Sequence, residues 1–281
     1  MIRQQKTKLG SNQKSTKAGN RALVLRMICT AQDSVSRIDL ARQTGLSKMS
    51  ITNIVDELLG ERLVIEQSGQ PPAKRSGSKT ASGRKPVYLA PDSKNHLALG
   101  LYISRDNAVA ALANLKGEIL NEKRCPFHFE ESEASFLEAI RTLIHSILDD
   151  ALAAGKKITG IGVASIGPLD IRRGIILEPP NFHKLKGIPL KQILEAEFQC
   201  PVTMDNDMNA AALAEKLYGK AKDISNFIYL GVTNGIGAGI LSDNAIFHGD
   251  MGFSGEIGHT TINFEGPKCA CGNTGCLELY A

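Results

Sequence analysis

Residues 252–278 read GFSGEIGHTTINFEGPKCACGNTGCLE and gather one histidine and three cysteines within a short part of this 281-residue chain. The four residues are His259, Cys269, Cys271 and Cys276. Three thiolates and one imidazole complete a tetrahedral shell, and soft sulfur donors select zinc over magnesium or calcium. Such a shell has no open position, so the pattern predicts a structural zinc site. The alternative is three reduced cysteines on a loop beside an unrelated histidine.

Carboxylates and amides occur around this stretch and at the end of an expected strand. Glu256 lies three residues before His259, and Asp205-Asn206-Asp207 follows the strand expected at Val202 to Met204. Carboxylates accept hydrogen bonds from hydroxyl groups, and an asparagine amide both donates and accepts. An Asn-Asp pair before a helix is also typical of a simple N-cap. From the residues alone, a sugar-binding role and a capping role both remain open.

A glycine-rich segment, Gly235 to Gly239, precedes Ile240 and Leu241. Backbone amides in such a segment can cradle a phosphate. The segment is no dinucleotide fingerprint, because the chain continues as a strand and opens no helix. A tight hairpin turn explains the glycines equally well.

The body of the chain predicts an α/β domain from about residue 95 to residue 281. Three successive strands are expected first, then helices alternate with strands, which is typical of α/β domains. The expected strands are 96–103, 108–115, 119–126, 158–165, 202–204, 227–232 and 237–241, and the expected helices are 136–147, 190–198 and 208–218.

Charge is divided unevenly along the chain. Residues 1–90 hold 16 Lys and Arg against 6 Asp and Glu, whereas residues 91–281 hold 17 against 23. Such asymmetry is typical of a polyanion-binding segment attached to an acidic body, although a basic solvated tail would give the same totals. No apolar run is long enough for a membrane span, and the basic N-terminus lacks a secretory signal, so we expect a cytoplasmic protein without membrane contact.

The basic segment predicts a flexible arm over 1–20 and a winged helix-turn-helix over 21–90. Helical periodicity begins at Asn20, a capping-box pattern at Ser36 opens a second helix, and Ser47 caps a third helix that ends at Gly60. Two expected strands, at 63–65 and 87–89, flank a basic wing. A three-helix module for protein contact is the alternative. The residues expected on DNA are Lys48, Ser50, Thr52 and Asn53 of the third helix, which would enter the major groove, and Lys74, Arg75, Arg84 and Lys85 of the wing, on phosphate or in the minor groove.

Nearly the whole chain resembles the ROK family of repressors, open reading frames and sugar kinases. The resemblance rests on Glu256-Ile257-Gly258-His259 with the Cys269–Glu278 motif, on Asn206-Asp207-x-Asn209-Ala210 with Glu215, and on Glu178-Pro179-Pro180-Asn181. It implies an actin-like, ribonuclease-H-type, sugar-kinase-like domain with sugar in the interdomain cleft. It also implies sugar contacts by Asn206, Asp207, Glu256, His259 and Glu278, with His259 serving both zinc and sugar. In family kinases the residue at Asp207 is the general base.

Departures from the family kinases indicate the repressor branch. Those kinases carry Asp-x-Gly-Gly-Thr after the first strand, whereas this chain has Tyr102-Ile103-Ser104-Arg105-Asp106 there, and the kinases lack the winged unit. We therefore expect a homodimeric, sugar-responsive repressor on double-stranded operator DNA and no catalysis. The alternatives are an ATP-dependent sugar kinase with an added DNA-binding unit, and a module that recruits another protein. Because the chain stops at Ala281, soon after Cys276, we expect its sugar domain to be incomplete at the C-terminus.

Overall fold

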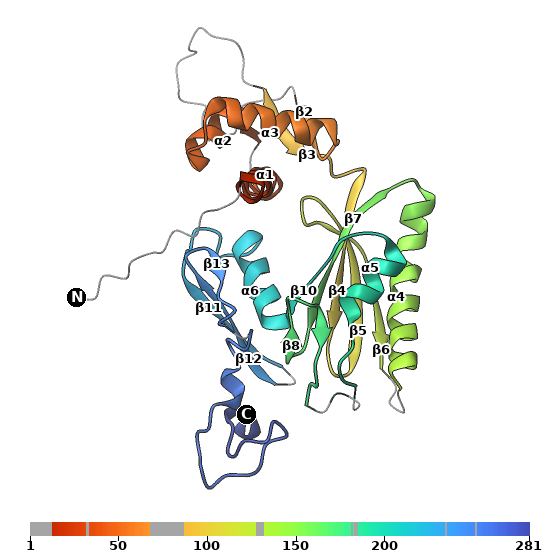
Figure 1. Ribbon diagram of the computed structural model, residues 1–281, viewed down its shortest axis with the longest axis vertical. Helices are drawn as coiled ribbons and strands as arrows, with labels where there is room; N and C mark the ends of the chain where they lie inside the picture. Colours follow the sequence, from red (N-terminus) through yellow and green to blue (C-terminus); the bar gives the residue numbers. More distant parts are fainter. Residues whose placement is uncertain are drawn as a thin grey trace, which may run out of the picture. The chain divides into compact units, whose positions relative to one another are not determined.

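The computed structural model describes residues 13–31, 34–67, 87–127, 132–180, 182, 185–233, 235–250 and 252–281. The chain divides into two units, Met1–Ser93 and Lys94–Ala281, and each is described by itself (Figure 1). Among the described residues, no helix combines the length and the apolar character that crossing a membrane requires.

Three helices and a small sheet form the first unit. The helices are α1 (Gln13–Thr30), α2 (Arg37–Thr44) and α3 (Lys48–Gly60). The antiparallel sheet has the order β1-β3-β2, with β1 at Val35–Ser36, β2 at Val64–Gln67 and β3 at Tyr88–Pro91. The strands expected at 63–65 and 87–89 overlap β2 and β3, whereas the sequence predicted no strand at β1. Apolar side chains from all three helices and the sheet share one core: Val24, Ile28, Leu40, Ile51, Ile54, Val55, Leu58, Val64 and Leu89.

Side-chain caps set the turn between α2 and α3. The Ser36 hydroxyl accepts from the Asp39 backbone N–H, and the Asp39 carboxylate accepts from the Ser36 backbone N–H, so the expected capping box is confirmed. At the other end of α2, Gly45 takes φ of 71°, a conformation that glycine adopts without steric cost, and donates its N–H to Ala41. Ser47 then caps α3 by accepting from the Ser50 N–H, as expected.

The first helix begins earlier than the sequence predicted. The chain is already helical from Gln13, so the flexible arm expected over 1–20 is wrong for residues 13–20. The Lys17 ammonium lies 2.6 Å from the Glu57 carboxylate of α3, and Arg21 pairs with Glu61. These pairs between helices supply an attraction that the polar local sequence does not reveal. The remainder of the expected arm, residues 1–12, lies outside the described residues.

The second unit is built on a mixed five-stranded sheet of order β10-β7-β4-β5-β6. The strands are β4 (His96–Ile103), β5 (Asn107–Asn114), β6 (Ile119–Pro126), β7 (Lys157–Ser165) and β10 (Val202–Asn206). β10, β7 and β4 run parallel, and β5 and β6 continue the sheet antiparallel. Helix α4 (Glu133–Ala153) covers one face, and α5 (Leu190–Phe198) packs beside β10 (Figure 1). These elements confirm the α/β pattern expected from the sequence.

A second sheet lies across helix α6 (Asp207–Leu217) from the first. It has the order β11-β12-β13, formed by Phe227–Val232, Ile236–Ser242 and Ala245–Ile246. Helix α6 packs against β11 and β12 on one side and against β10 and β7 on the other (Figure 1). The α6 N-terminus is thereby held between the two sheets.

Glycines of the 235–239 segment explain this close packing. Gly237 and Gly239 belong to strand β12. A Cβ at Gly239 would lie 2.1 Å from the Met208 carbonyl oxygen of α6. Such a distance is impossible for a side-chain carbon, so glycine here allows the helix to approach the strand.

The remaining elements are a short hairpin and the two short helices of the Gly252–Glu278 motif. The hairpin of β8 (Leu169–Asp170) and β9 (Ile175–Ile176) follows β7. Two 3₁₀ helices, η2 (Ile257–His259) and η3 (Leu277–Tyr280), flank the cysteine loop. Isolated bridges Thr261–Cys276 and Lys268–Thr274 fold that loop back on itself.

Candidate metal centre and adjoining cleft

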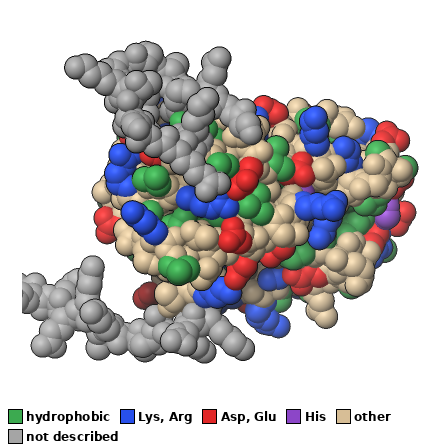
Figure 2. Space-filling view, turned by 90° about the horizontal axis from the view of Figure 1, so that it is seen from above, with side chains coloured by type: hydrophobic (Ala, Val, Ile, Leu, Met, Phe, Trp, Pro, Cys, Tyr) green, Lys and Arg blue, Asp and Glu red, His purple; other side chains and the backbone are tan. Residues whose placement is uncertain are grey.

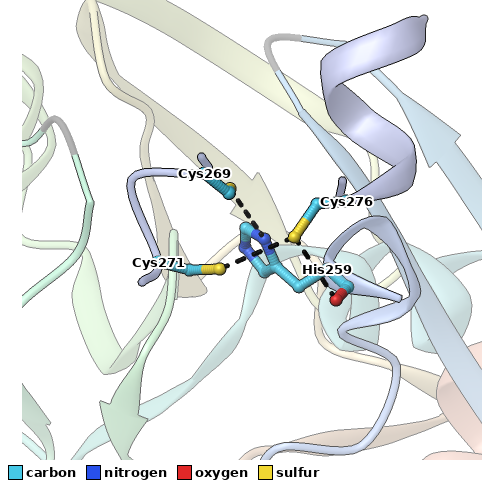
Figure 3. Close-up of side chains that lie close together, drawn as sticks. All are labelled: His259, Cys269, Cys271 and Cys276. Atoms are coloured by element: carbon cyan, nitrogen blue, oxygen red, sulfur yellow. Dashed lines mark hydrogen bonds between the residues drawn. The ribbon is translucent and has the colours of Figure 1, made fainter. Parts of the chain in front are cut away.

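His259, Cys269, Cys271 and Cys276 converge on one point (Figure 3). One ligand atom from each lies within 4.8 Å of the others. The Cys271 and Cys276 sulfurs are 3.7 Å apart, and the Cys269 sulfur is 3.7 Å from His259 Nδ1. A tetrahedral zinc ion with Zn–S bonds of about 2.3 Å places its sulfurs about 3.8 Å apart. The four residues therefore fit zinc in both donor type and spacing.

The thiols of this centre lie in unequal surroundings. Burial raises the pKa of the Cys276 thiol to about 12, whereas a hydrogen bond from the Asn273 backbone lowers the pKa of the exposed Cys271 thiol. A buried thiol such as Cys276 becomes a thiolate only beside a compensating positive charge. A divalent metal ion supplies that charge.

A cleft of about 210 Å³ adjoins the centre and contains all five residues expected to contact sugar. Asn206 and Asp207 lie where β10 passes into α6, Glu256 and His259 lie at η2, and Glu278 lies in η3. The Asn206 side-chain oxygen accepts from the Met208 N–H at 2.8 Å, so Asn206 is the N-cap of α6 and also lines the cleft. Both roles that the sequence left open for Asn206 are therefore compatible.

The carboxylates of the cleft perturb one another. Desolvation raises the pKa of Asp207, and hydrogen bonds from backbone N–H groups and the charge of Arg105 partly offset it. Desolvation also raises the pKa of Glu256, with further contributions from the negative charges of Asp207 and Glu278 and an opposing one from His259. Glu278 Oε1 lies 3.6 Å from His259 Nδ1, which joins the cleft to the candidate metal centre. Clustered acceptors of this kind suit a ligand that presents several hydroxyl donors.

Basic and aromatic side chains also line the cleft. Tyr102, Val109 and Arg124 are cross-strand neighbours on β4, β5 and β6, and both Tyr102 and Arg124 line the cleft. Desolvation and the negative charge of Asp207 raise the pKa of Tyr102. Arg105 projects from the β4–β5 turn toward the β11–β12 turn, since a Cβ built on Gly235 would lie 3.8 Å from its guanidinium. Arg105 therefore reaches from one sheet to the other across the cleft.

Several polar residues of this region were not predicted as site residues. Arg105 and Arg124 belong to turns and strands that the sequence indicated, but their convergence depends on the sheet order. The His248 Nε2 atom lies 2.8 Å from the Asp205 carboxylate, which also accepts from the Asn209 amide at 2.9 Å. The position of Asp205 next to Asn206 was a possible signal, whereas no local signal marks His248.

Residues expected on DNA are only partly described. Lys48 and Asn53 are exposed on α3, and Ser50 and Thr52 are half-buried. The Thr52 hydroxyl donates to the Lys48 carbonyl, and the Ser50 hydroxyl lies 2.9 Å from that of Ser47. Met49, which carried no prediction, is 71% exposed on the same helix. The wing residues Lys74, Arg75, Arg84 and Lys85 lie outside the described residues.

The basic excess of residues 1–90 lies mostly outside the described segments. The described residues of this range hold eight Lys and Arg against five Asp and Glu. Four of the eight pair with acidic groups: Lys17, Arg21, Arg37 and Arg42. Among the side chains coloured in Figure 2, basic and acidic ones are intermixed on the face that it presents.

The family model that matches the chain is that of the ROK family, and it covers residues 98–281. The chain belongs to the ROK family. The mixed sheet with helices on both faces is thus the actin-like, kinase-type domain of ROK proteins. The resemblance inferred from residues 206–209 and 252–278 is confirmed.

Similar ROK proteins include regulators and kinases. The xylose repressor of Caldicellulosiruptor bescii is 36% identical over 93% of this chain and 63% of its own length. A solved ROK transcriptional regulator, described as a homologue of the E. coli Mlc protein, matches 95% of this chain and 65% of its own, with a TM-score of 0.78 and 31% identity. A Streptomyces griseus ROK glucokinase, solved with glucose and AMPPNP, matches 66% of this chain and 57% of its own, with a TM-score of 0.59 and 28% identity. The chain therefore spans slightly less than two thirds of the length of these two regulators.

Proposed function

We propose that this ROK chain is a sugar-responsive transcriptional repressor that binds double-stranded operator DNA. The observation that carries the proposal is the presence, in one chain, of a capped three-helix unit and a cleft lined by five candidate sugar ligands. The ROK regulator of known structure supports it, because it matches 95% of this chain and hence includes the three-helix unit. We include a cytoplasmic location in the proposal, as expected of a repressor that acts on operator DNA.

In this proposal residues 21–90 form a winged helix-turn-helix, and residues 95–281 form the sugar-binding domain. Helix α3 would lie in the major groove and present Lys48, Ser50, Thr52 and Asn53 to the bases. The basic residues at 74, 75, 84 and 85 would contact phosphates and make the affinity salt-dependent. Helix-turn-helix proteins commonly bind two-fold operators, so we include a homodimer in the proposal.

Asn206, Asp207, Glu256, His259 and Glu278 would bind the hydroxyl groups of the effector. His259 would also ligate zinc together with Cys269, Cys271 and Cys276, which links metal and sugar through one imidazole. The zinc ion would cross-link the loop between η2 and η3 and thereby hold His259 and Glu278 in position. Sugar binding would lower DNA affinity through a coupling free energy between the two units.

A sugar kinase is the second candidate, and the retained Asp207 favours it. The ROK glucokinase solved with glucose and AMPPNP shares the same fold. Against it, Tyr102 stands where the resemblance implies the aspartate of the phosphate motif, Ser104 and Arg105 stand where it implies the two glycines, and all three line the cleft. Phosphoryl transfer depends on magnesium and close backbone contact with those phosphates. A tyrosine ring and a guanidinium supply neither, so we propose that the cleft binds sugar without phosphorylating it.

Gel retardation with a DNA fragment containing the upstream region of a sugar-utilisation operon tests the proposal. We expect retardation at low salt that weakens at higher salt, and release of DNA by one sugar among xylose, glucose and N-acetylglucosamine. Lys48→Ala with Asn53→Ala should abolish the shift, whereas Asp150→Ala on the exposed surface of α4 should preserve it. Absence of retardation at low salt contradicts DNA binding. ATP-dependent phosphorylation of one of the sugars that is lost in Asp207→Asn would establish the kinase instead.

A further inference from the structure

A second cavity, of about 740 Å³, opens beside the cleft and shares Gly167, Pro180, Glu256 and His259 with it. Ligand pockets typically measure about 300–1,000 Å³. The cleft, at about 210 Å³, is smaller than this range, whereas the adjoining chamber lies within it. A ligand that binds the cleft carboxylates can therefore extend past Glu256 and His259 into the chamber.

The chamber has an apolar floor that belongs to the core of the domain. Phe182 and Leu185 are 1% and 5% exposed and pack with the sheet and α4. The Phe182 ring meets the Phe136 ring edge-on, with centroids 5.7 Å apart, and lies 6.4 Å from the Phe127 ring. A floor anchored in this aromatic cluster is preorganised, so a ligand need not order it on binding.

The walls of the chamber are an exposed aromatic ring and a carboxylate. Phe253 lines the chamber and is 44% exposed, so its ring is accessible to a ligand there. Glu178 is exposed at the chamber beside Pro179 and Pro180. A purely apolar occupant would desolvate this carboxylate without giving it a hydrogen bond. A sugar ring instead offers C–H groups on its face to Phe253 and hydroxyl donors at its edge to Glu178.

We propose that the chamber is a subsite for a second sugar ring, so that the preferred effector is a disaccharide or longer oligosaccharide. The proposal rests on the proposed sugar-binding role of the cleft, which would hold the first ring. Phe253 would pack on the second ring and Glu178 would accept from one of its hydroxyls. The two residues would thus select for chain length, while the cleft selects the first sugar.

Calorimetric titration of the full chain with matched sugars tests this subsite. The probes are xylose, glucose and N-acetylglucosamine, the β-1,4-linked disaccharide of each, maltose, and the phenyl β-glycosides of the three monosaccharides. We expect one of the disaccharides to bind at least about tenfold more tightly than its monosaccharide. Phe253→Ala should lower the affinity for the disaccharide about five- to twentyfold, which is the loss expected when an aromatic ring in contact with the ligand is truncated. The affinity for the monosaccharide should stay unchanged.

Phe264→Ala is the matched control, because Phe264 is 83% exposed in the same part of the chain and does not line the chamber. If disaccharides bind no more tightly than monosaccharides, or if Phe253→Ala leaves the disaccharide affinity unchanged, the subsite is overturned and the proposed function stays intact. Failure of every monosaccharide and disaccharide to bind would instead reject the sugar-binding role itself. If a phenyl glycoside binds as tightly as the best disaccharide and Glu178→Gln changes neither affinity, the chamber takes an apolar substituent and the second-ring proposal is wrong.

Discussion

Replacing Asp207 with Asn tests the cleft most directly, because it removes one charge and almost no volume. Asp207 Oδ1 accepts from the Met208 N–H at 2.9 Å, and an Asn oxygen can accept the same bond. The start of α6 should therefore survive. A sugar hydroxyl that donates to a carboxylate gains about 1–2 kcal/mol over one that donates to a neutral amide. We expect sugar affinity to fall roughly five- to thirtyfold.

Whereas the substitution should weaken sugar binding, it should make the sugar-free protein more stable at higher pH. Desolvation raises the pKa of Asp207 in the folded chain, so the folded state holds this proton more tightly than the unfolded state does. The contribution to stability is fully present below the ordinary carboxyl pKa and is lost as pH rises through the raised folded pKa. The side-chain amide of the Asp207→Asn variant cannot ionise and does not incur this loss. The free energy of unfolding of the variant, relative to the parent protein, should therefore increase with pH above the ordinary carboxyl range.

Two measurements on the same samples check both expectations. Calorimetric titration with the effector sugar gives the affinity, and urea unfolding between pH 4 and pH 8 gives the free energy of unfolding. Asp223→Asn, at an exposed position beyond α6, serves as the control and should change neither quantity. Unaltered sugar affinity in Asp207→Asn, or a stability difference that does not vary with pH, would refute the account of the cleft.

Two further changes address the metal centre and the helix packing. Cys276→Ser should reduce bound zinc from about one equivalent to near zero and lower the melting temperature, as measured by elemental analysis and thermal unfolding, whereas Cys29→Ser should retain the metal; full zinc in the first variant would contradict the site. Gly239→Ala should destabilise the second unit by about 1–3 kcal/mol through overpacking, because the new Cβ would lie 2.1 Å from the α6 backbone. Gly19→Ala, which meets no atom within 4 Å in α1, should instead be neutral or stabilising in urea unfolding, and equal effects at the two glycines would contradict the packing argument.

Local signals predicted most of the secondary structure, whereas long-range contacts decided the rest. Ser36 and Ser47 marked helix starts correctly because a cap acts within three residues of itself. The start of α1 was missed because Lys17 pairs with Glu57, forty residues away in the sequence. The spacing of the cysteines and His259 was sufficient to indicate a metal site, since the ligands lie on one short loop.

The convergence of Arg105 and Arg124 on the cleft could not be predicted, because it depends on how the strands and sheets are arranged. Arg105 and Gly235 meet only because α6 holds the second sheet against the first, and neither residue signals the other locally. The packing role of Gly237 and Gly239 was beyond prediction for the same reason. A phosphate loop and a hairpin turn remained open for them, and the fold adds a third role, because a Cβ at either position would meet α6 at Met208.

Binding and catalysis place different demands on the cleft. In our proposal the sugar is held by the acceptors Asp207, Glu256 and Glu278, which the fold brings together in the cleft. Phosphoryl transfer also requires a site for magnesium and phosphate, and the resemblance to the family kinases implies that site where Tyr102, Ser104 and Arg105 line this cleft. Desolvation raises the pKa of Asp207, and backbone hydrogen bonds and the positive charge of Arg105 offset that rise only in part. The raised pKa of Asp207 therefore does not argue against a general base, and our proposal of recognition without catalysis rests instead on the replaced phosphate motif at Tyr102, Ser104 and Arg105.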